Sequence, residues 1–153
     1  MAYDAMEIAN YIIKKHISIN KPITNMKLQK LLYFAWIKYF KECGEHLFED
    51  PIFAWRYGPV VREVYREYGV YGGVPISSPR GPEDMKEIDK STAKCLDEII
   101  EKYKDTSASK LVKRTHKPGH PWQKVYQEGN NDVVIDFKDL EAVCNDEDIT
   151  PFI

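Results

Sequence analysis

The sequence predicts a mainly α-helical fold in which several short helices pack around one unusually apolar central helix. Apolar residues recur at helical spacing along most of the chain, and Gly and Pro separate these stretches at short intervals. The 153 residues, 43% hydrophobic and 30% charged, suffice for one buried core. We therefore expect a single compact domain spanning 1–153, with room for two or three very short strands.

Two helices are predicted at the N-terminus. The first spans about residues 4–17, where apolar side chains recur at the spacing of one helical face, and it is broken by the Asn-Lys-Pro at 20–22. The second runs from about 25 to 43, with Thr24 or Asn25 as its N-terminal cap.

The helix predicted at 25–43 is apolar around most of its circumference, and Gly44 is placed to end it. Only one stripe, made of four lysines, is predicted to face water: Lys27, Lys30, Lys38 and Lys41. A helix that is apolar on several sides has to be covered on several sides. We therefore expect it to be the central element of the fold.

The middle of the chain is predicted to contain an extended stretch, a short helix and an irregular segment. Residues 52–55 are predicted to be extended. Gly58 and Pro59 are predicted to open a helix that ends at Gly69, because proline is favoured at the first helical position. The Gly- and Pro-rich segment 70–83 is predicted to be irregular, as a mobile loop or a partner-binding arm.

Further short elements are predicted in the C-terminal half. Helices are expected in three places: about 89–104, 106–117 and 136–145. Thr106 and Asp136 are the predicted caps of the second and third of these helices. A helical turn is expected after Trp122 and a short strand at 133–135, and the acidic tail at 146–148 is predicted to fray.

Composition narrows the classes of function. The net charge is −2 and the pI about 6.1, so the chain lacks the excess of Lys and Arg that nucleic-acid binding uses. The three cysteines are far apart, which is typical of a reduced compartment. No apolar run approaches the ~20 residues of a membrane span, and the N-terminus lacks the apolar region of a signal peptide. We expect a cytoplasmic protein without a membrane or nucleic-acid partner.

Motifs of catalysis and cofactor binding are absent from the sequence. It contains no phosphate-binding GxGxxG or GK[ST] pattern and no GxSxG elbow, so we expect no enzyme, no cofactor and no catalytic residues. One candidate zinc site combines Cys43 and His46 with His116 and His120, whose spacings resemble zinc-ligand pairs. Glycine or proline interrupts both pairs, and we expect no metal there.

Two segments carry the residue types that are enriched at binding hot spots. One is the aromatic and arginine-containing stretch 53–61, which precedes a predicted helix, and the other is the rigid turn 115–122, which ends in a tryptophan. The predicted partner-contacting residues are Trp55, Arg56, Tyr57, Tyr65 and Trp122. The alternative is that these side chains only pack the scaffold.

Three blocks of this sequence recur together in one known family. Residues 24–33, TNMKLQKLLY, match an opening block T-x-x-K-L-Q-K-L-L-Y, and residues 54–61, AWRYGPVV, match a central block A-W-x-x-G-P-V. Residues 111–122, LVKRTHKPGHPW, match a third block L-x-x-x-T-H…P-W. With these blocks in the same order and spacing, the chain resembles the Panacea domain family, also described as phage-associated or GepA-like proteins, from about Met6 to Ile149.

The resemblance implies an antitoxin. Members of the family are commonly the antitoxins of small toxin–antitoxin operons, often on prophages, so the implied partner is a cognate protein toxin that is neutralised by direct contact. The family implies no catalytic residues. Many relatives carry an additional N-terminal DNA-binding or other module, and we expect no such module, and hence no transcriptional autoregulation, from this chain. The blocks fall on the expected scaffold. We therefore expect partner specificity to come from the solvent-exposed helix faces and the loops between the blocks, with the loop 70–83 adapting to the partner.

Three other functions remain as alternatives. The first is an adaptor that delivers a partner protein to a protease. The second is a zinc-dependent hydrolase built on the zinc candidates named above. The third is a nucleic-acid-binding regulator, which the charge balance disfavours.

Overall fold

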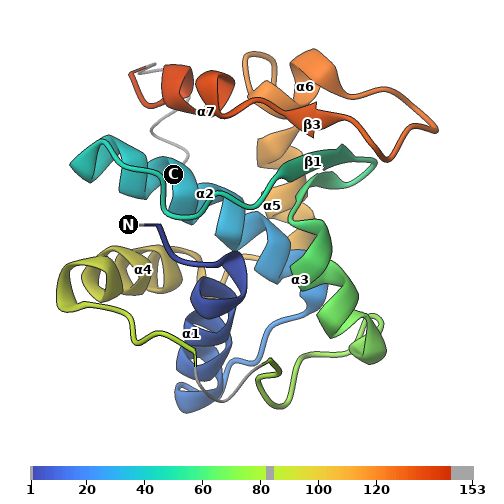
Figure 1. Ribbon diagram of the computed structural model, residues 1–153. Helices are drawn as coiled ribbons and strands as arrows, with labels where there is room; N and C mark the ends of the chain where they lie inside the picture. The colour runs from blue at the N-terminus through green and yellow to red at the C-terminus, as the bar shows by residue number, and fades with distance from the viewer. Residues whose placement is uncertain (1, 82–84, 146–153) are drawn as a thin grey trace.

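The computed structural model describes residues 2–81 and 85–145 and confirms the mainly α-helical fold (Figure 1). The helices are α1 (Ala5–Ser18), α2 (Asn25–Cys43), α3 (Arg62–Glu67), the 3₁₀ helix η1 (Tyr68–Tyr71), α4 (Lys90–Tyr103), α5 (Ala108–Thr115), α6 (Pro121–Val125) and α7 (Phe137–Val143). The strands are β1 (Ile52–Trp55), β2 (Gly58–Val60) and β3 (Val134–Ile135). Within the described residues, no helix has the length and apolar character needed to cross a membrane.

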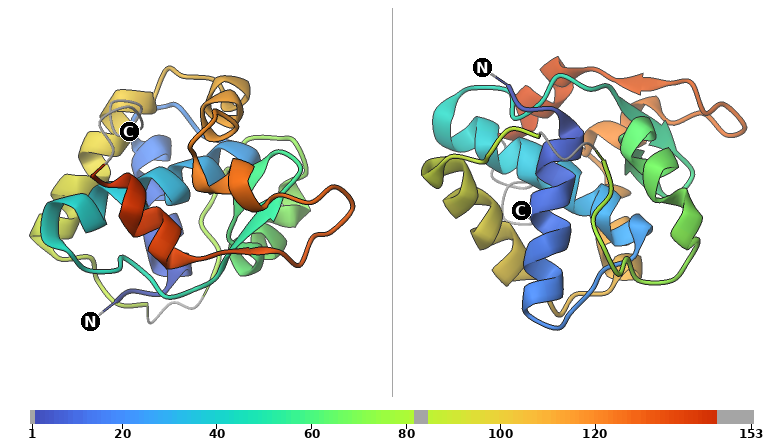
Figure 2. Two further views of the ribbon diagram at one scale, coloured as in Figure 1. Left: turned by 90° about the horizontal axis from the view of Figure 1, so that it is seen from above. Right: turned by 60° about the horizontal axis from the view of Figure 1, so that its bottom comes forward.

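Helix α2 is the central element, as predicted. It runs through the middle of the molecule, with α1 and α4 on one side and the sheet, α6 and α7 on the other (Figures 1 and 2). Every residue from Asn25 to Ile37 except Met26 is buried. Thr24 caps the N-terminus of α2, and Gly44, with a φ of 72°, ends it in the left-handed conformation that favours glycine.

The prediction that the four lysines of α2 face water is wrong for two of them. Lys27 is only 8% exposed and Lys30 only 1%. The Lys27 Nζ donates to the carbonyl oxygen of Lys104 at 3.2 Å, and the Lys30 Nζ donates to that of Pro59 at 3.0 Å. The stripe is covered here because the end of α4 and strand β2 lie against this half of α2.

The three strands form a small antiparallel sheet in the order β2-β1-β3. Trp55 pairs with Gly58 and Ala54 with Pro59, so these residues form a hairpin. The prediction that Pro59 opens a helix is therefore wrong, since α3 begins at Arg62. Proline is tolerated in β2 because β2 is an edge strand, where a missing N–H need not cost a ladder hydrogen bond.

The C-terminal helices and the short strand are found in the predicted places, and one predicted cap is wrong. Ser107, and not Thr106, caps α5, because its Oγ accepts the N–H of Lys110 at 3.2 Å. Asp136 caps α7 as predicted, through its contact with the N–H of Lys138 at 2.9 Å. The predicted acidic tail at 146–148 lies outside the described residues.

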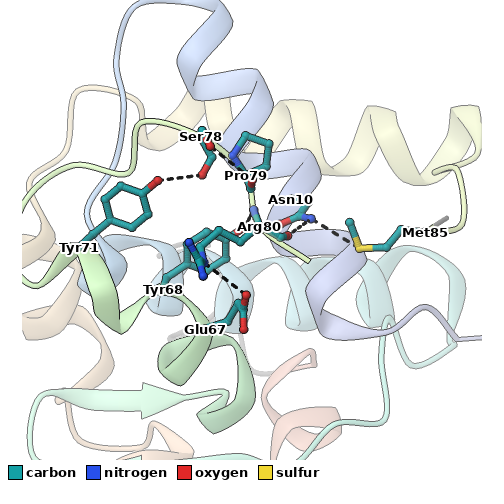
Figure 3. A network of polar contacts seen from close by, with 8 residues as sticks. All are labelled: Asn10, Glu67, Tyr68, Tyr71, Ser78, Pro79, Arg80 and Met85. Carbon is teal, nitrogen blue, oxygen red and sulfur yellow. Dashed lines mark hydrogen bonds and ion pairs between the residues drawn. The ribbon is translucent and has the colours of Figure 1, made fainter. Parts of the chain in front are cut away.

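The Gly- and Pro-rich segment after η1 is irregular, and two contacts fasten it to the body of the protein. Ile76 is fully buried, and its N–H donates to the carbonyl oxygen of Ile23 at 2.8 Å. The Tyr68 hydroxyl accepts the N–H of Arg80 at 2.7 Å and donates to Asn10 Oδ1 (Figure 3). Up to Gly81, the segment is therefore attached to α1 and to the start of α2 and does not extend as an arm.

We expect Tyr68→Phe to destabilise the protein, because it keeps the buried ring but leaves Asn10 and the Arg80 amide without their shared partner. A buried polar group that loses its partner costs about 1–3 kcal/mol of the free energy of unfolding, measurable by urea unfolding. The control is Tyr71→Phe, which removes a hydroxyl that, among the described residues, bonds to the exposed Ser77 and Ser78, and it should cost less than about 0.5 kcal/mol. Equal losses in the two variants would contradict this assignment.

Candidate partner-binding surface

The turn between β1 and β2 presents two of the predicted contact residues to solvent. Arg56 and Tyr57 form this turn, and Tyr57 is 54% exposed. Gly58 follows with a φ of 114°, which side-chain-bearing residues rarely adopt. A Cβ on Gly58 would lie 2.7 Å from Thr115 Oγ1 and 2.9 Å from Lys30 Cε. Glycine therefore allows the hairpin to lie directly against α2 and α5.

An aromatic pair stands beside this turn. The rings of Trp55 and Tyr65 meet edge to face, with centroids 5.0 Å apart and planes at 73°. The Trp55 Nε1 donates to the carbonyl oxygen of Asn131 at 3.0 Å, which fixes the indole. The guanidinium of Arg56 lies 5.5 Å from the centroid of the Tyr57 ring. Four of the five predicted contact residues are thus brought together on one surface.

These four residues line a pocket of about 590 Å³, which we call the hairpin pocket. Its remaining lining comes from the N-terminal half of α2, from Val60 of β2, from Gly72 and Gly73 after η1, from Ala108 at the start of α5, and from Asn131. The pocket therefore lies where the hairpin, two helix N-termini and the segment after η1 meet.

Trp122, the fifth predicted contact residue, lies away from this pocket and is 7% exposed. Its ring stacks on His116, with centroids 3.7 Å apart, and on Tyr126, with centroids 4.6 Å apart. Its Nε1 donates to the carbonyl oxygen of Trp55 at 2.6 Å. Trp122 therefore supports the hairpin from within the fold.

Two buried side-chain amides connect α2 to the hairpin and to α3. Gln29 Nε2 donates to Asn25 Oδ1 at 3.0 Å, and Gln29 Oε1 accepts the N–H of Val61 at 2.9 Å. Asn25 Nδ2 in turn donates to the carbonyl oxygen of Tyr65 at 2.9 Å. These consecutive hydrogen bonds satisfy the buried polar groups of Asn25 and Gln29 and hold this part of the pocket lining in place.

Lys30 is buried where α2, β2 and α5 meet. Within the described residues, its Nζ bonds to the carbonyl oxygen of Pro59 and forms no ion pair with a carboxylate. Burial lowers the pKa of Lys30 to about 7, because a charged ammonium is poorly solvated there. Burial, and secondarily the charge of Lys30, lowers the pKa of His116. At neutral pH the Lys30 amine is therefore only partly protonated, whereas an exposed lysine is fully charged.

Sequence reasoning missed three residues of this site, namely Asn25, Gln29 and Lys30. A signal was present for Lys30, because leucines and aromatics surround it on a helix that is apolar on nearly all sides. Lysine is seldom fully buried, however, so four lysines along one helix predict an exposed stripe.

The histidines considered as zinc ligands have other contacts. His46 Nδ1 lies 2.9 Å from Glu49 Oε1, and its Nε2 lies 3.1 Å from Glu141 Oε2. His120 Nδ1 lies 3.4 Å from the hydroxyl oxygen of Tyr33. In residues 2–81 and 85–145, no group of three or more His, Cys, Asp or Glu side chains is arranged to hold a metal ion.

Comparison with known proteins gives the family. The family model described as "Antitoxin SocA-like, Panacea domain" matches residues 28–123. The chain belongs to this family of SocA-like antitoxins. Antitoxin SocA of Caulobacter vibrioides (strain NA1000 / CB15N) is 30% identical over 131 residues, which cover 80% of this chain and 70% of that protein. No solved structure matches the chain. The Panacea domain match contains Lys30, the whole hairpin and Trp122, and it confirms the resemblance found in the sequence.

Replacing Lys30 with methionine should change how the free energy of unfolding depends on pH, because burying the charged amine destabilises the folded state. In the unfolded chain a lysine holds its proton up to about pH 10.4, whereas folded Lys30 releases it near pH 7. Between these values the unfolded state binds more protons, so the contribution of Lys30 to stability rises with pH. The stability of Lys30→Met relative to the unmodified chain should therefore be greatest below pH 7 and fall by about 2–5 kcal/mol towards pH 10.

The measurement is urea unfolding across this pH range, with Lys41→Met as the control. Lys41 lies on the same helix and is exposed, so its replacement should leave a difference that does not change between pH 7 and pH 9. A pH-independent difference for Lys30→Met would contradict the assignment.

Proposed function

We propose that this chain neutralises a cognate protein toxin by binding it directly, with the hairpin pocket and its rim as the contact surface. Membership of the SocA-like antitoxin family supports an antitoxin role and implies a toxin as partner. The observation that carries the choice of surface is the convergence of Trp55, Arg56, Tyr57 and Tyr65 on one pocket. Tryptophan, tyrosine and arginine are the residues that most often dominate binding energy at protein interfaces.

The surroundings of the pocket support the same choice. Large apolar side chains are exposed in its lining and next to it in the chain: Met26, Tyr57, Tyr65, Val70 and Val74. Val70 and Val74 flank the two glycines of the lining and are 72% and 63% exposed. Exposed apolar groups gathered beside a pocket are typical of protein interaction sites, because burying them in a complex removes apolar surface from water.

The pocket is also held in shape before any partner binds. Two hydrogen bonds hold Trp55 in place. Its indole Nε1 donates to the carbonyl oxygen of Asn131, and its own carbonyl oxygen accepts from the Nε1 of Trp122. A surface with few rotamers to immobilise loses less entropy on binding, so more of the contact energy remains as affinity.

The decisive experiment compares Tyr57→Ala with Val134→Ala. Both side chains are about half exposed, but only Tyr57 lines the pocket. The probe is the protein encoded by the neighbouring gene, once it is known to kill when expressed alone. Tyr57→Ala should weaken its binding by about 30-fold in calorimetry, equivalent to about 2 kcal/mol, and should reduce protection of growing cells. Val134→Ala should leave affinity and protection unchanged, and equal effects of the two changes would exclude the pocket as the contact surface.

A second experiment separates direct neutralisation from delivery of the toxin to a protease. In a host that lacks the ATP-dependent proteases, direct binding predicts full protection by the unmodified chain. Loss of protection in that host, with binding to the toxin intact, would contradict direct neutralisation and favour the adaptor function.

A further inference from the structure

The hairpin pocket is lined by positive charge, although the whole chain carries a net charge of −2. The charged side chains among its described lining residues are those of Lys30 and Arg56, and neither aspartate nor glutamate occurs there. Arg56 is exposed at the turn, whereas Lys30 is almost fully buried. The pocket lining thus contains one exposed, permanently charged guanidinium and one buried amine that is partly protonated at neutral pH.

No carboxylate in the part of the chain that the structure describes compensates the charge of protonated Lys30. The ammonium of Lys30 has three N–H donors, and the carbonyl oxygen of Pro59 accepts one of them. A carbonyl oxygen is a neutral acceptor, so it does not compensate a buried positive charge as a carboxylate does. An anion that entered the pocket would supply this compensation.

Two helices add to the positive potential. Thr24, Asn25 and Met26, at the N-terminus of α2, lie in the lining together with Ala108, the first residue of α5. A helix N-terminus carries about half a positive charge, which stabilises a nearby anion. The two termini and the two side chains therefore favour the same sign of charge in the same place.

The walls of the pocket restrict what carries that anion. Apolar surface in the same lining comes from Trp55, Tyr65, Val60 and Met26. A nucleic acid needs several cations to neutralise successive phosphates, and the lining offers one exposed side-chain cation. A peptide with an acidic residue beside an apolar one matches both the charges and the walls.

We propose that the hairpin pocket receives an acidic segment of the toxin, whose Asp or Glu carboxylate lies between Arg56 and Lys30. The neighbouring apolar side chain of that segment packs against Trp55 and Tyr65. The identity of the partner rests on the proposed function, whereas the preference for a carboxylate rests on the pocket itself. Arginine is suited to this contact because its planar guanidinium can bind a carboxylate through two N–H groups.

The test uses the purified chain and two capped tripeptides, acetyl-Leu-Glu-Phe-amide and acetyl-Leu-Gln-Phe-amide, in an NMR titration of backbone amides. We expect the Glu peptide to shift the amide signals of Gln29, Arg56, Gly73 and Ala108, and the Gln peptide to bind at least about 10-fold more weakly, since it lacks the charge. The two peptides have the same shape, so the comparison isolates the carboxylate.

Matched variants assign the effect to the two cations. Lys30→Met and Arg56→Gln should each weaken binding of the Glu peptide by about 10-fold or more. Lys41→Met, on the same helix as Lys30, and Arg66→Gln, beside Tyr65 but outside the lining, should leave it unchanged. Arg56 is exposed, so its replacement tests the proposal without disturbing the core.

Three results of the peptide titrations would overturn the proposal. These are no shift at about 10 mM Glu peptide, where even millimolar affinity is visible, equal binding of the two peptides, or undiminished binding in both Lys30→Met and Arg56→Gln. Tighter binding of a short oligothymidylate at the same residues would overturn it in favour of a nucleic-acid ligand. If the chain binds the Glu peptide but does not neutralise the toxin, the proposed function is wrong and the preference of the pocket for a carboxylate stands. If the chain neutralises the toxin but binds the Glu and Gln peptides equally, the preference for a carboxylate is wrong and the proposed function stands.

Discussion

The attachment of the β1–β2 hairpin to helix α2 is the contact on which the rest of the structure depends. Two consecutive side chains of α2 make it, since Gln29 Oε1 accepts the N–H of Val61 at 2.9 Å and Lys30 Nζ donates to the carbonyl oxygen of Pro59 at 3.0 Å. The sheet is too small to hold the hairpin alone, because β3 contributes only two residues. The aromatic residues at the turn therefore take their positions from side chains of the central helix.

The same contact brings together the three sequence blocks of the family. Lys30 comes from the first block, Gly58 from the second and Thr115 from the third, and a Cβ on Gly58 would lie within 3 Å of the other two side chains. This close approach explains why glycine is needed there. It does not explain a lysine, because apolar residues of similar volume often replace buried charged groups with no loss of stability. The fold does not by itself require an amine at this position.

Local sequence patterns were sufficient to predict the central helix. The features that they did not predict depend on contacts between residues that are distant in the sequence. The helix was predictable because its apolar residues cover more than half of its circumference. The hairpin was not, because a Gly-Pro pair suits a helix start as well as a turn, and the choice depends on Gly58 fitting against α2 and α5. The burial of Lys27 and Lys30 depends on carbonyl groups of Lys104 and Pro59, which are distant in the sequence.

The predicted contact residues show the same difference between local and long-range information. Trp55, Arg56, Tyr57 and Tyr65 lie within one short stretch of chain, so a cluster of hot-spot residue types in the sequence became a cluster on the surface. Trp122 has the same residue type, but its contacts with His116, Tyr126 and the Trp55 carbonyl oxygen turn it inward. A supporting role does not exclude the proposed contact role, because Trp55 both lines the pocket and accepts the hydrogen bond of Trp122. A surface whose aromatic side chains are already held by hydrogen bonds loses little entropy on binding, and this property supports the pocket as the proposed contact surface.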